Sequence, residues 1–174
     1  MAGGTLMIAG RMEIVIVGCG RWLYGDDLAG LAAAEALLGM RLPDVRIYAS
    51  ESPAADIALY ATDARILIVI DAARASEDLP AGFWRRVNYR EIKDRLNEAR
   101  SPSAHTLSVT TALTLADRLG CLPPDVWIYA IGAVSTEAGA KMSKAVARAV
   151  QEVTEAVRRD VIVWHRKHAE LSHA

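Results

Sequence analysis

The chain has 174 residues, a net charge of −1 and 24% charged residues, so it is long enough for one well-buried domain and has no overall charge to attract nucleic acid or an anionic membrane. No apolar run approaches the roughly 20 residues needed to span a bilayer, and no basic segment precedes the short apolar stretch near the N-terminus. With only Cys19 and Cys121, the sequence predicts a reduced cytoplasmic protein without a disulfide framework or a thiolate metal site.

The first predicted element is a strand over residues 14–17, whose apolar and β-branched side chains are typical of a strand covered on both faces. A loop with Gly18, Gly20 and Gly25 follows, where the backbone is free to adopt angles that a Cβ would forbid. Gly-x-Gly after a first strand is half of a dinucleotide-binding fingerprint, so a small nucleotide-binding domain is one hypothesis. The third glycine of that fingerprint would fall at Leu23, which makes this the weaker hypothesis.

A helix is predicted to begin near Asp26 and Asp27 and to continue through an alanine-rich run to Leu38. An N-cap and a favourable interaction with the helix dipole account for one acidic residue. Two adjacent acidic residues at the C-terminal end of a buried strand, where open α/β sheets place their ligands, indicate a functional site. A metal ion is the natural ligand for such a pair.

A second strand is predicted at 45–48, a helix at 53–62 and a deeply buried strand at 66–70. Asp71 follows that strand directly. It is either a turn or cap residue, or a functional carboxylate, because adjacent parallel strands would bring Asp27 and Asp71 within reach of one ion.

An edge strand is predicted at 83–89, because arginines interrupt its apolar pattern. Basic and acidic residues alternate over 85–100, which favours a solvated face over a docking surface for an acidic partner. A helix is predicted at 106–119 with Ser103 as its cap. His105 then lies in the first turn, either as a polar residue near a helix end or as a nitrogen ligand beside the carboxylates.

The last predicted strand spans 126–131, and apolar residues at spacings of three and four from Met142 onward predict a long amphipathic helix. Strand and helix alternate throughout, so we expect a three-layer α/β sandwich with a mostly parallel sheet of about five strands and helices on both faces. Residues 1–11 are expected to form an N-terminal extension, 12–160 the domain and 161–174 a C-terminal tail.

The candidate ligands are therefore Asp27, Asp71 and His105. Two carboxylates and one imidazole leave coordination positions open, unlike closed structural metal sites, and this favours catalysis. A metal held there can polarise a peptide carbonyl and lower the pKa of a bound water towards ~7, as hydrolysis requires. No motif pairs a serine or Cys19 with a histidine base.

Three motifs in order resemble a known family, the endopeptidases that mature nickel-iron hydrogenases. They are a glycine loop running into an acidic pair, an apolar strand ending in Asp-Ala, and a Ser-x-His helix start, found here at residues 18–30 (GCGRWLYGDDLAG), 70–72 (IDA) and 103–105 (SAH). The resemblance covers roughly residues 12–160. Arg21 stands where the family has asparagine, Leu28 where it has glycine, and residues 132–135 lack its Glu-Pro.

The resemblance implies that Asp27, the second acid of the pair, forms the metal site with Asp71 and His105, while Asp26 can serve as a cap. It implies an endopeptidase that removes the C-terminal extension of a hydrogenase large-subunit precursor after nickel has been inserted. Nickel would then arrive in the substrate. A non-enzymatic checkpoint or chaperone for the nickel site, using the same ligands, is the alternative.

Overall fold

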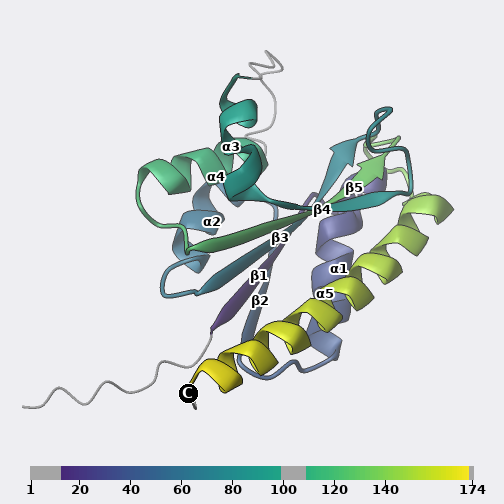
Figure 1. Cartoon of the computed structure of the whole chain (residues 1–174). Helices are drawn as coiled ribbons and strands as arrows, with labels where there is room; N and C mark the ends of the chain where they lie inside the picture. The colour runs from purple at the N-terminus through teal and green to yellow at the C-terminus, as the bar shows by residue number, and fades with distance from the viewer. Residues whose placement is uncertain (1–12, 99–108, 173–174) are drawn as a thin grey trace, which may run out of the picture.

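The computed structural model describes residues 13–98 and 109–172, which form a five-stranded sheet covered by helices on both faces (Figure 1). The strands are β1 (Ile14–Cys19), β2 (Val45–Ser50), β3 (Ile66–Arg74), β4 (Trp84–Asn88) and β5 (Asp125–Ala133). The helices are the 3-10 turn η1 (Gly25–Leu28), α1 (Ala29–Gly39), α2 (Pro53–Tyr60), α3 (Tyr89–Glu98), α4 (Val109–Arg118) and α5 (Lys144–Ser172).

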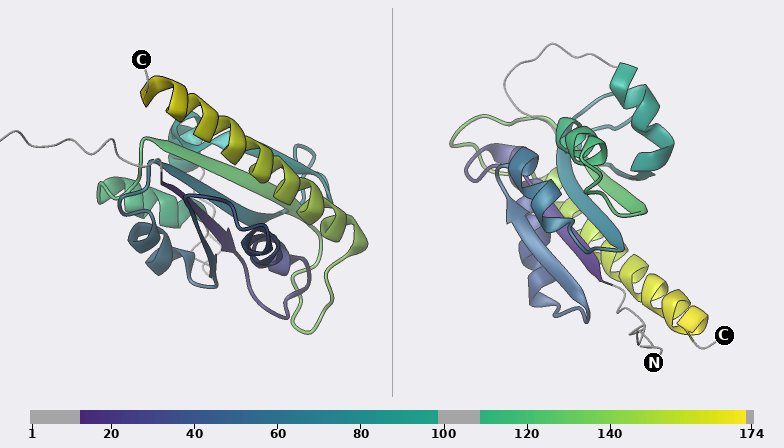
Figure 2. Two further views of the ribbon diagram at one scale, coloured as in Figure 1. Left: turned by 90° about the horizontal axis from the view of Figure 1, so that it is seen from below. Right: turned by 90° about the vertical axis from the view of Figure 1, so that its left-hand side faces the viewer.

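The sheet order is β2-β1-β3-β5-β4, and every pairing is parallel except that of β4 with β5. The predicted three-layer α/β architecture and the edge position of β4 are therefore confirmed. Helices α1 and α5 lie on one face of the sheet, and α2, α3 and α4 lie on the other (Figures 1 and 2).

Alternation of side chains along the central strands builds a separate core on each face. In β1, Ile14 and Ile16 pack in the core shared with α1 and α5, whereas Val15 and Val17 pack in the core shared with α2 and α4. All four side chains are fully buried, as the continuous apolar run predicts for a strand covered on both faces.

The first helix differs from its prediction, because η1 precedes it and α1 begins at Ala29. Neither Asp26 nor Asp27 caps α1, whose N-terminus has no side-chain cap. The strand predicted to end at residue 70 continues as β3 to Arg74, so Asp71 lies inside the strand, paired with Ala130 of β5.

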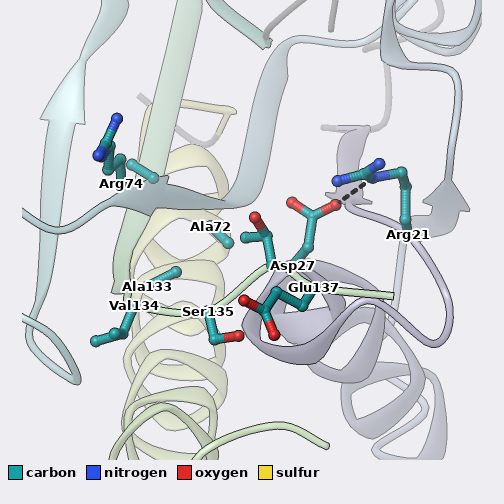
Figure 3. A pocket seen from close by; sticks show the side chains of 10 residues that line it. Arg21, Asp27, Ala72, Arg74, Ala133, Val134, Ser135 and Glu137 are labelled. Carbon is teal, nitrogen blue, oxygen red and sulfur yellow. Dashed lines mark hydrogen bonds and ion pairs between the residues drawn. The ribbon is translucent and has the colours of Figure 1, made fainter. Parts of the chain in front are cut away.

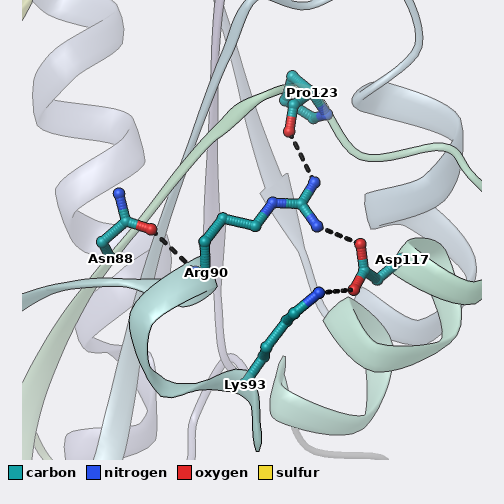
Figure 4. Close-up of polar contacts among 5 residues, drawn as sticks. All are labelled: Asn88, Arg90, Lys93, Asp117 and Pro123. Atoms are coloured by element: carbon teal, nitrogen blue, oxygen red, sulfur yellow. Dashed lines mark hydrogen bonds and ion pairs between the residues drawn. The ribbon is translucent and has the colours of Figure 1, made fainter.

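The basic segment after β4 forms α3, a helix that the sequence analysis did not predict. Arg90 pairs with Asp117 of α4 and donates to the carbonyl oxygen of Pro123 over 2.9 Å, and Lys93 Nζ lies 3.4 Å from Asp117 (Figure 4). These cations fix α3 to the neighbouring elements, so they are not simply part of a solvated face. Ser103 and His105 lie outside the described residues.

The predicted boundary at residue 160 falls within α5, which continues to Ser172. Val161 is fully buried, and Trp164 stacks on Trp127 of β5 with 6.1 Å between ring centroids. Residues 161–172 therefore extend the packed helix, and the expected extension at 1–11 lies outside the described residues. Within the described ranges, no helix has the length and apolar character needed to cross a membrane.

Candidate functional site

A cleft of about 610 Å³ opens at the carboxyl ends of β3 and β5, beside the loop that follows β1 (Figure 3). Open α/β sheets bind their ligands at this edge. The lining comes from three segments, namely Arg21 and Asp27, residues 72–74, and residues 133–137.

Asp26 is buried and ties two loops together. Its carboxylate accepts hydrogen bonds from the backbone N–H groups of Ser143 (2.7 Å), Val134 (3.1 Å) and Ser135 (3.4 Å). Burial alone would raise the pKa of Asp26, but the hydrogen bonds from Ser143, Val134 and Ser135 outweigh it and lower that pKa below its ordinary value. Asp26 is thus a structural link between the β1–α1 and β5–α5 connections, a role different from the helix cap considered from the sequence.

Asp27, the next residue, faces the cleft (Figure 3). Its side chain is 20% exposed, and its Oδ2 atom accepts a hydrogen bond from Arg21 Nε over 2.7 Å. The Arg21 guanidinium in turn lies over the ring of Tyr24, with its Cζ atom 4.0 Å from the ring centroid. Among the described residues, Asp27 thus has Arg21 as a side-chain partner, and the cleft lies beside it.

Asp71 lies on β3, the strand adjacent to β1 in the sheet. Burial, together with the charge of Asp27, raises the pKa of Asp71 from its ordinary value to about 7, against a smaller lowering by the N–H group of Ala72. The structure thus brings Asp27 and Asp71 close enough for electrostatic coupling, as the strand order would require. Their role as metal ligands remains a prediction.

The third predicted ligand, His105, lies outside the described residues. Within residues 13–98 and 109–172, no three histidine, cysteine or acidic residues converge closely enough to hold a metal ion. Of the three predicted ligands, the described part of the chain contains the two carboxylates, Asp27 and Asp71. Oxygen donors of this kind suit divalent cations without selecting strongly among them.

Cys19 is buried at the end of β1. Burial raises the pKa of its thiol well above the ordinary value, and the charges of Asp71 and Asp56 raise it further. The thiol therefore stays protonated, which agrees with the absence of a cysteine-protease motif.

The glycine loop is explained by close packing inside the chain. A Cβ at Gly18 would lie 2.0 Å from the carbonyl oxygen of Gly30, and a Cβ at Gly20 would lie 1.9 Å from that of Asp27. These glycines let the loop fold back on η1 and let β1 approach α1. The nucleotide hypothesis is not needed to explain them.

Three charged residues of the cleft, Arg21, Arg74 and Glu137, were not predicted from the sequence as site residues. Arg21 was noted only as a departure from the family pattern, and Glu137 was not singled out. Glu137 follows β5, so the rule that places ligands after parallel strands could have drawn attention to it. A single sequence carries no signal for the pairing of Arg21 with Asp27.

Comparison with known proteins connects this fold to hydrogenase maturation. The family model described as HycI, hydrogenase maturation protease, matches residues 52–160. This segment, more than half of the chain, contains Asp71 and position 105 but begins after Asp27. No curated protein sequence gives a significant match.

Several solved structures share the fold. The hydrogenase maturating endopeptidase HybD from Escherichia coli is 19% identical, with a TM-score of 0.67 over 84% of this chain and 90% of that one. HybD from Thermococcus kodakarensis is 24% identical, with a TM-score of 0.66 over 86% of this chain and 99% of that one. A solution structure of an Escherichia coli endopeptidase is 23% identical, with a TM-score of 0.69 over 84% of this chain and 90% of that one.

At these identities the structural likeness establishes the shared fold, while the family model adds the match in sequence. Together they agree with the resemblance carried by the glycine loop, the acidic pair and the Asp-Ala strand end. This protein belongs to the hydrogenase maturation protease family.

Proposed function

We propose that this protein is an endopeptidase that removes the C-terminal extension from the nickel-loaded large-subunit precursor of a nickel-iron hydrogenase. The observation that carries the proposal is the position of Asp27 in an open cleft at the carboxyl edge of the sheet, with Asp71 on the adjacent strand β3. Membership of a protease family supports the reaction class. Nickel is part of the substrate in this account.

The carboxylate pair supports a site for a cation. Desolvation of Asp71, a half-buried residue, and the negative charge of nearby Asp27 raise its pKa to about 7. A divalent cation placed between the two groups would replace this repulsion by attraction and would favour the ionised form of Asp71. His105, as a nitrogen donor, would complete a three-ligand set that leaves positions for ligands from the precursor.

The cleft supports a macromolecular substrate. Its volume of about 610 Å³ accommodates several residues of an extended segment, and its lining combines small side chains with charged ones. Two apolar side chains on the bordering loops, Leu23 and Val134, are largely exposed. Gly139 N–H donates to the Leu23 carbonyl over 2.7 Å, so these loops are held next to each other and offer an apolar rim.

In the proposed reaction, the fold of the chain positions the two carboxylates and the loop beside them. Asp27 and Asp71 approach from adjacent parts of the sheet edge, and the tie formed by Asp26 holds the loop of residues 133–137 against them. The scissile peptide would then be placed by the nickel that the precursor already carries. Nickel supplies Lewis-acid assistance to peptide hydrolysis when it is bound.

The direct test is to incubate the purified protein with nickel-loaded precursor and to measure the masses of the products. The proposal predicts a shortened large subunit and one released C-terminal peptide. Stable binding of the precursor without release of the peptide would contradict the proposed protease activity and favour the checkpoint or chaperone alternative. Asp71→Asn, which keeps the shape of the side chain, serves as the inactive comparison.

A further inference from the structure

Arg21 is attached to Asp27 at two points. Its Nε atom donates to the Asp27 carboxylate over 2.7 Å, and its backbone N–H donates to the Asp27 carbonyl over 3.3 Å. The guanidinium also lies over Tyr24, at 4.0 Å from Cζ to the ring centroid. Arg21 is therefore held in place on the loop beside the cleft, with the contact to Asp27 visible in Figure 3.

This contact occupies part of the carboxylate that a cation would need. Oδ2 of Asp27 accepts the Arg21 hydrogen bond, so its electron pair in that direction is engaged. The guanidinium also places a permanent positive charge beside the cleft, because arginine stays protonated in proteins. A divalent cation arriving at Asp27 meets both the occupied oxygen and like-charge repulsion.

We propose that Arg21 is a specificity-determining residue that competes with free divalent cations for Asp27 and releases it to a cation delivered with the precursor. This inference rests on the proposed function, since it takes Asp27 as a ligand to the nickel of the substrate. It assigns a role to a position where this chain departs from the asparagine of the family it resembles.

The exposure of the ion pair makes the competition modest and reversible. The side chains of Arg21 and Asp27 are 38% and 20% exposed, and the contact uses the single Nε atom. Such pairs are weak, so the binding free energy of a whole precursor can displace the guanidinium. A free metal ion brings no interface of its own, and Arg21 therefore lowers its affinity.

The first measurement is calorimetric titration of the metal-free protein with nickel chloride alone. Arg21→Asn should bind nickel roughly 3- to 5-fold more tightly than the wild type, the upper part of the range expected for removing one partly exposed competing ion pair. Arg21→Lys, which keeps the positive charge, should stay closer to the wild type. A purely structural role for Arg21 predicts the opposite sign, namely weaker nickel binding by Arg21→Asn.

Arg158→Asn is the matched control. The Arg158 side chain is also 38% exposed, and it pairs with Glu155 on α5, so the variant loses the same charge and a similar ion pair away from the cleft. Its nickel affinity should remain within about twofold of the wild type. If Arg21→Asn does not fold, Arg21→Gln, which keeps more of the stem over Tyr24, takes its place.

A double-mutant cycle assigns the effect to Asp27. In the Asp27→Asn background, the further change Arg21→Asn should alter nickel affinity by less than about twofold, because the carboxylate under competition is gone. Equal nickel affinities of wild type and Arg21→Asn, including undetectable binding by both, would overturn the inference. So would an equal gain from Arg21→Asn when Asp27 is absent.

The nickel titration and the cleavage assay test different claims, so either can fail without the other. Tighter nickel binding by Arg21→Asn, with no cleavage of precursor by any variant, would support the competition and reject the protease proposal. Normal cleavage together with unchanged nickel affinity would reject only the competition.

Discussion

Asp26 and Asp27 are consecutive residues of one 3-10 turn, yet their surroundings differ completely. Asp26 is 1% exposed and accepts three backbone hydrogen bonds from the β5–α5 connection. The Asp27 side chain is 20% exposed, pairs with Arg21 within the part of the chain that the structure describes, and has a cleft beside it. A carboxylate whose acceptor sites are filled by the backbone holds the fold, whereas one with open acceptor sites is available to a ligand.

The largest expected effect comes from Asp27→Asn. We expect processing of the precursor to fall by roughly 100-fold or more, because a ligand carboxylate is lost. The unfolding midpoint should move by only about 1–3 °C, since the lost ion pair is partly exposed. Parallel processing assays and thermal unfolding measure both quantities, and a large loss of stability together with activity would show that Asp27 is structural.

Asp26→Asn should have the opposite profile. The neutral amide accepts the three backbone N–H groups poorly, so we expect the free energy of unfolding to fall by about 2–4 kcal/mol. Activity measured well below the unfolding midpoint should decrease less than for Asp27→Asn. Denaturant unfolding gives the stability, and equal losses of activity in the two variants would mean that the wrong carboxylate has been assigned to the site.

Asp71 and Asp26 are expected to change the free energy of unfolding in opposite directions with pH. Its pKa is raised to about 7 in the folded protein, so between its ordinary value and 7 the folded state holds a proton that the unfolded state has released. This group therefore makes folding less favourable as pH rises from about 4 to about 7. The lowered pKa of Asp26 acts in the opposite direction, and its stabilisation is lost as pH falls below about 4.

Asp71→Asn should consequently be more stable than the wild type at pH 8, by about 1–3 kcal/mol, and should lose this advantage near pH 4. Urea unfolding of both proteins across that range measures the difference. A constant difference at all pH values would show that the pKa of Asp71 is not raised by its surroundings. Greater stability with lost activity is the combination expected when a functional site stores unfavourable electrostatics.

The smallest expected effect is that of Ser143→Ala. The backbone N–H of Ser143 continues to bind Asp26, but the hydroxyl is lost, which accepts from Val146 N–H over 3.3 Å at the start of α5 and also helps to lower the pKa of Asp26. We expect a decrease of about 0.5–1 kcal/mol in the free energy of unfolding. A loss as large as that of Asp26→Asn would show that the Ser143 hydroxyl contributes more to the tie between the loops than the three backbone N–H groups do.

The sheet could be predicted well from the sequence because its central strands are unbroken runs of apolar residues. Residues 14–17 and 66–70 are continuous apolar runs, and both are buried parallel strands. The helix α3 was missed because its charges suggested a solvated surface, while Arg90 and Lys93 are used to pair with Asp117. Ion pairs between elements distant in sequence leave no periodic signal.

The candidate site could be predicted only in part. Strand order explains why Asp27 and Asp71 come near each other, because β1 and β3 are adjacent and their carboxyl ends meet at the edge where open α/β sheets bind ligands. The division of roles between Asp26 and Asp27 depends on which one meets the N–H groups of residues 134, 135 and 143, more than 100 positions later in the chain. Likewise, the pairing of Arg21 with Asp27 requires the three-dimensional fold of the loop.

The central claim is that nickel carried by the precursor binds to Asp27, Asp71 and His105 and so guides cleavage of the precursor. The most direct measurement gives the protein, shown by elemental analysis to carry no metal, either nickel-loaded or nickel-stripped precursor, with no metal added. We expect the C-terminal extension to be released from the nickel-loaded precursor and to remain on the stripped one. Efficient cleavage of the stripped precursor by the metal-free protein would contradict the account.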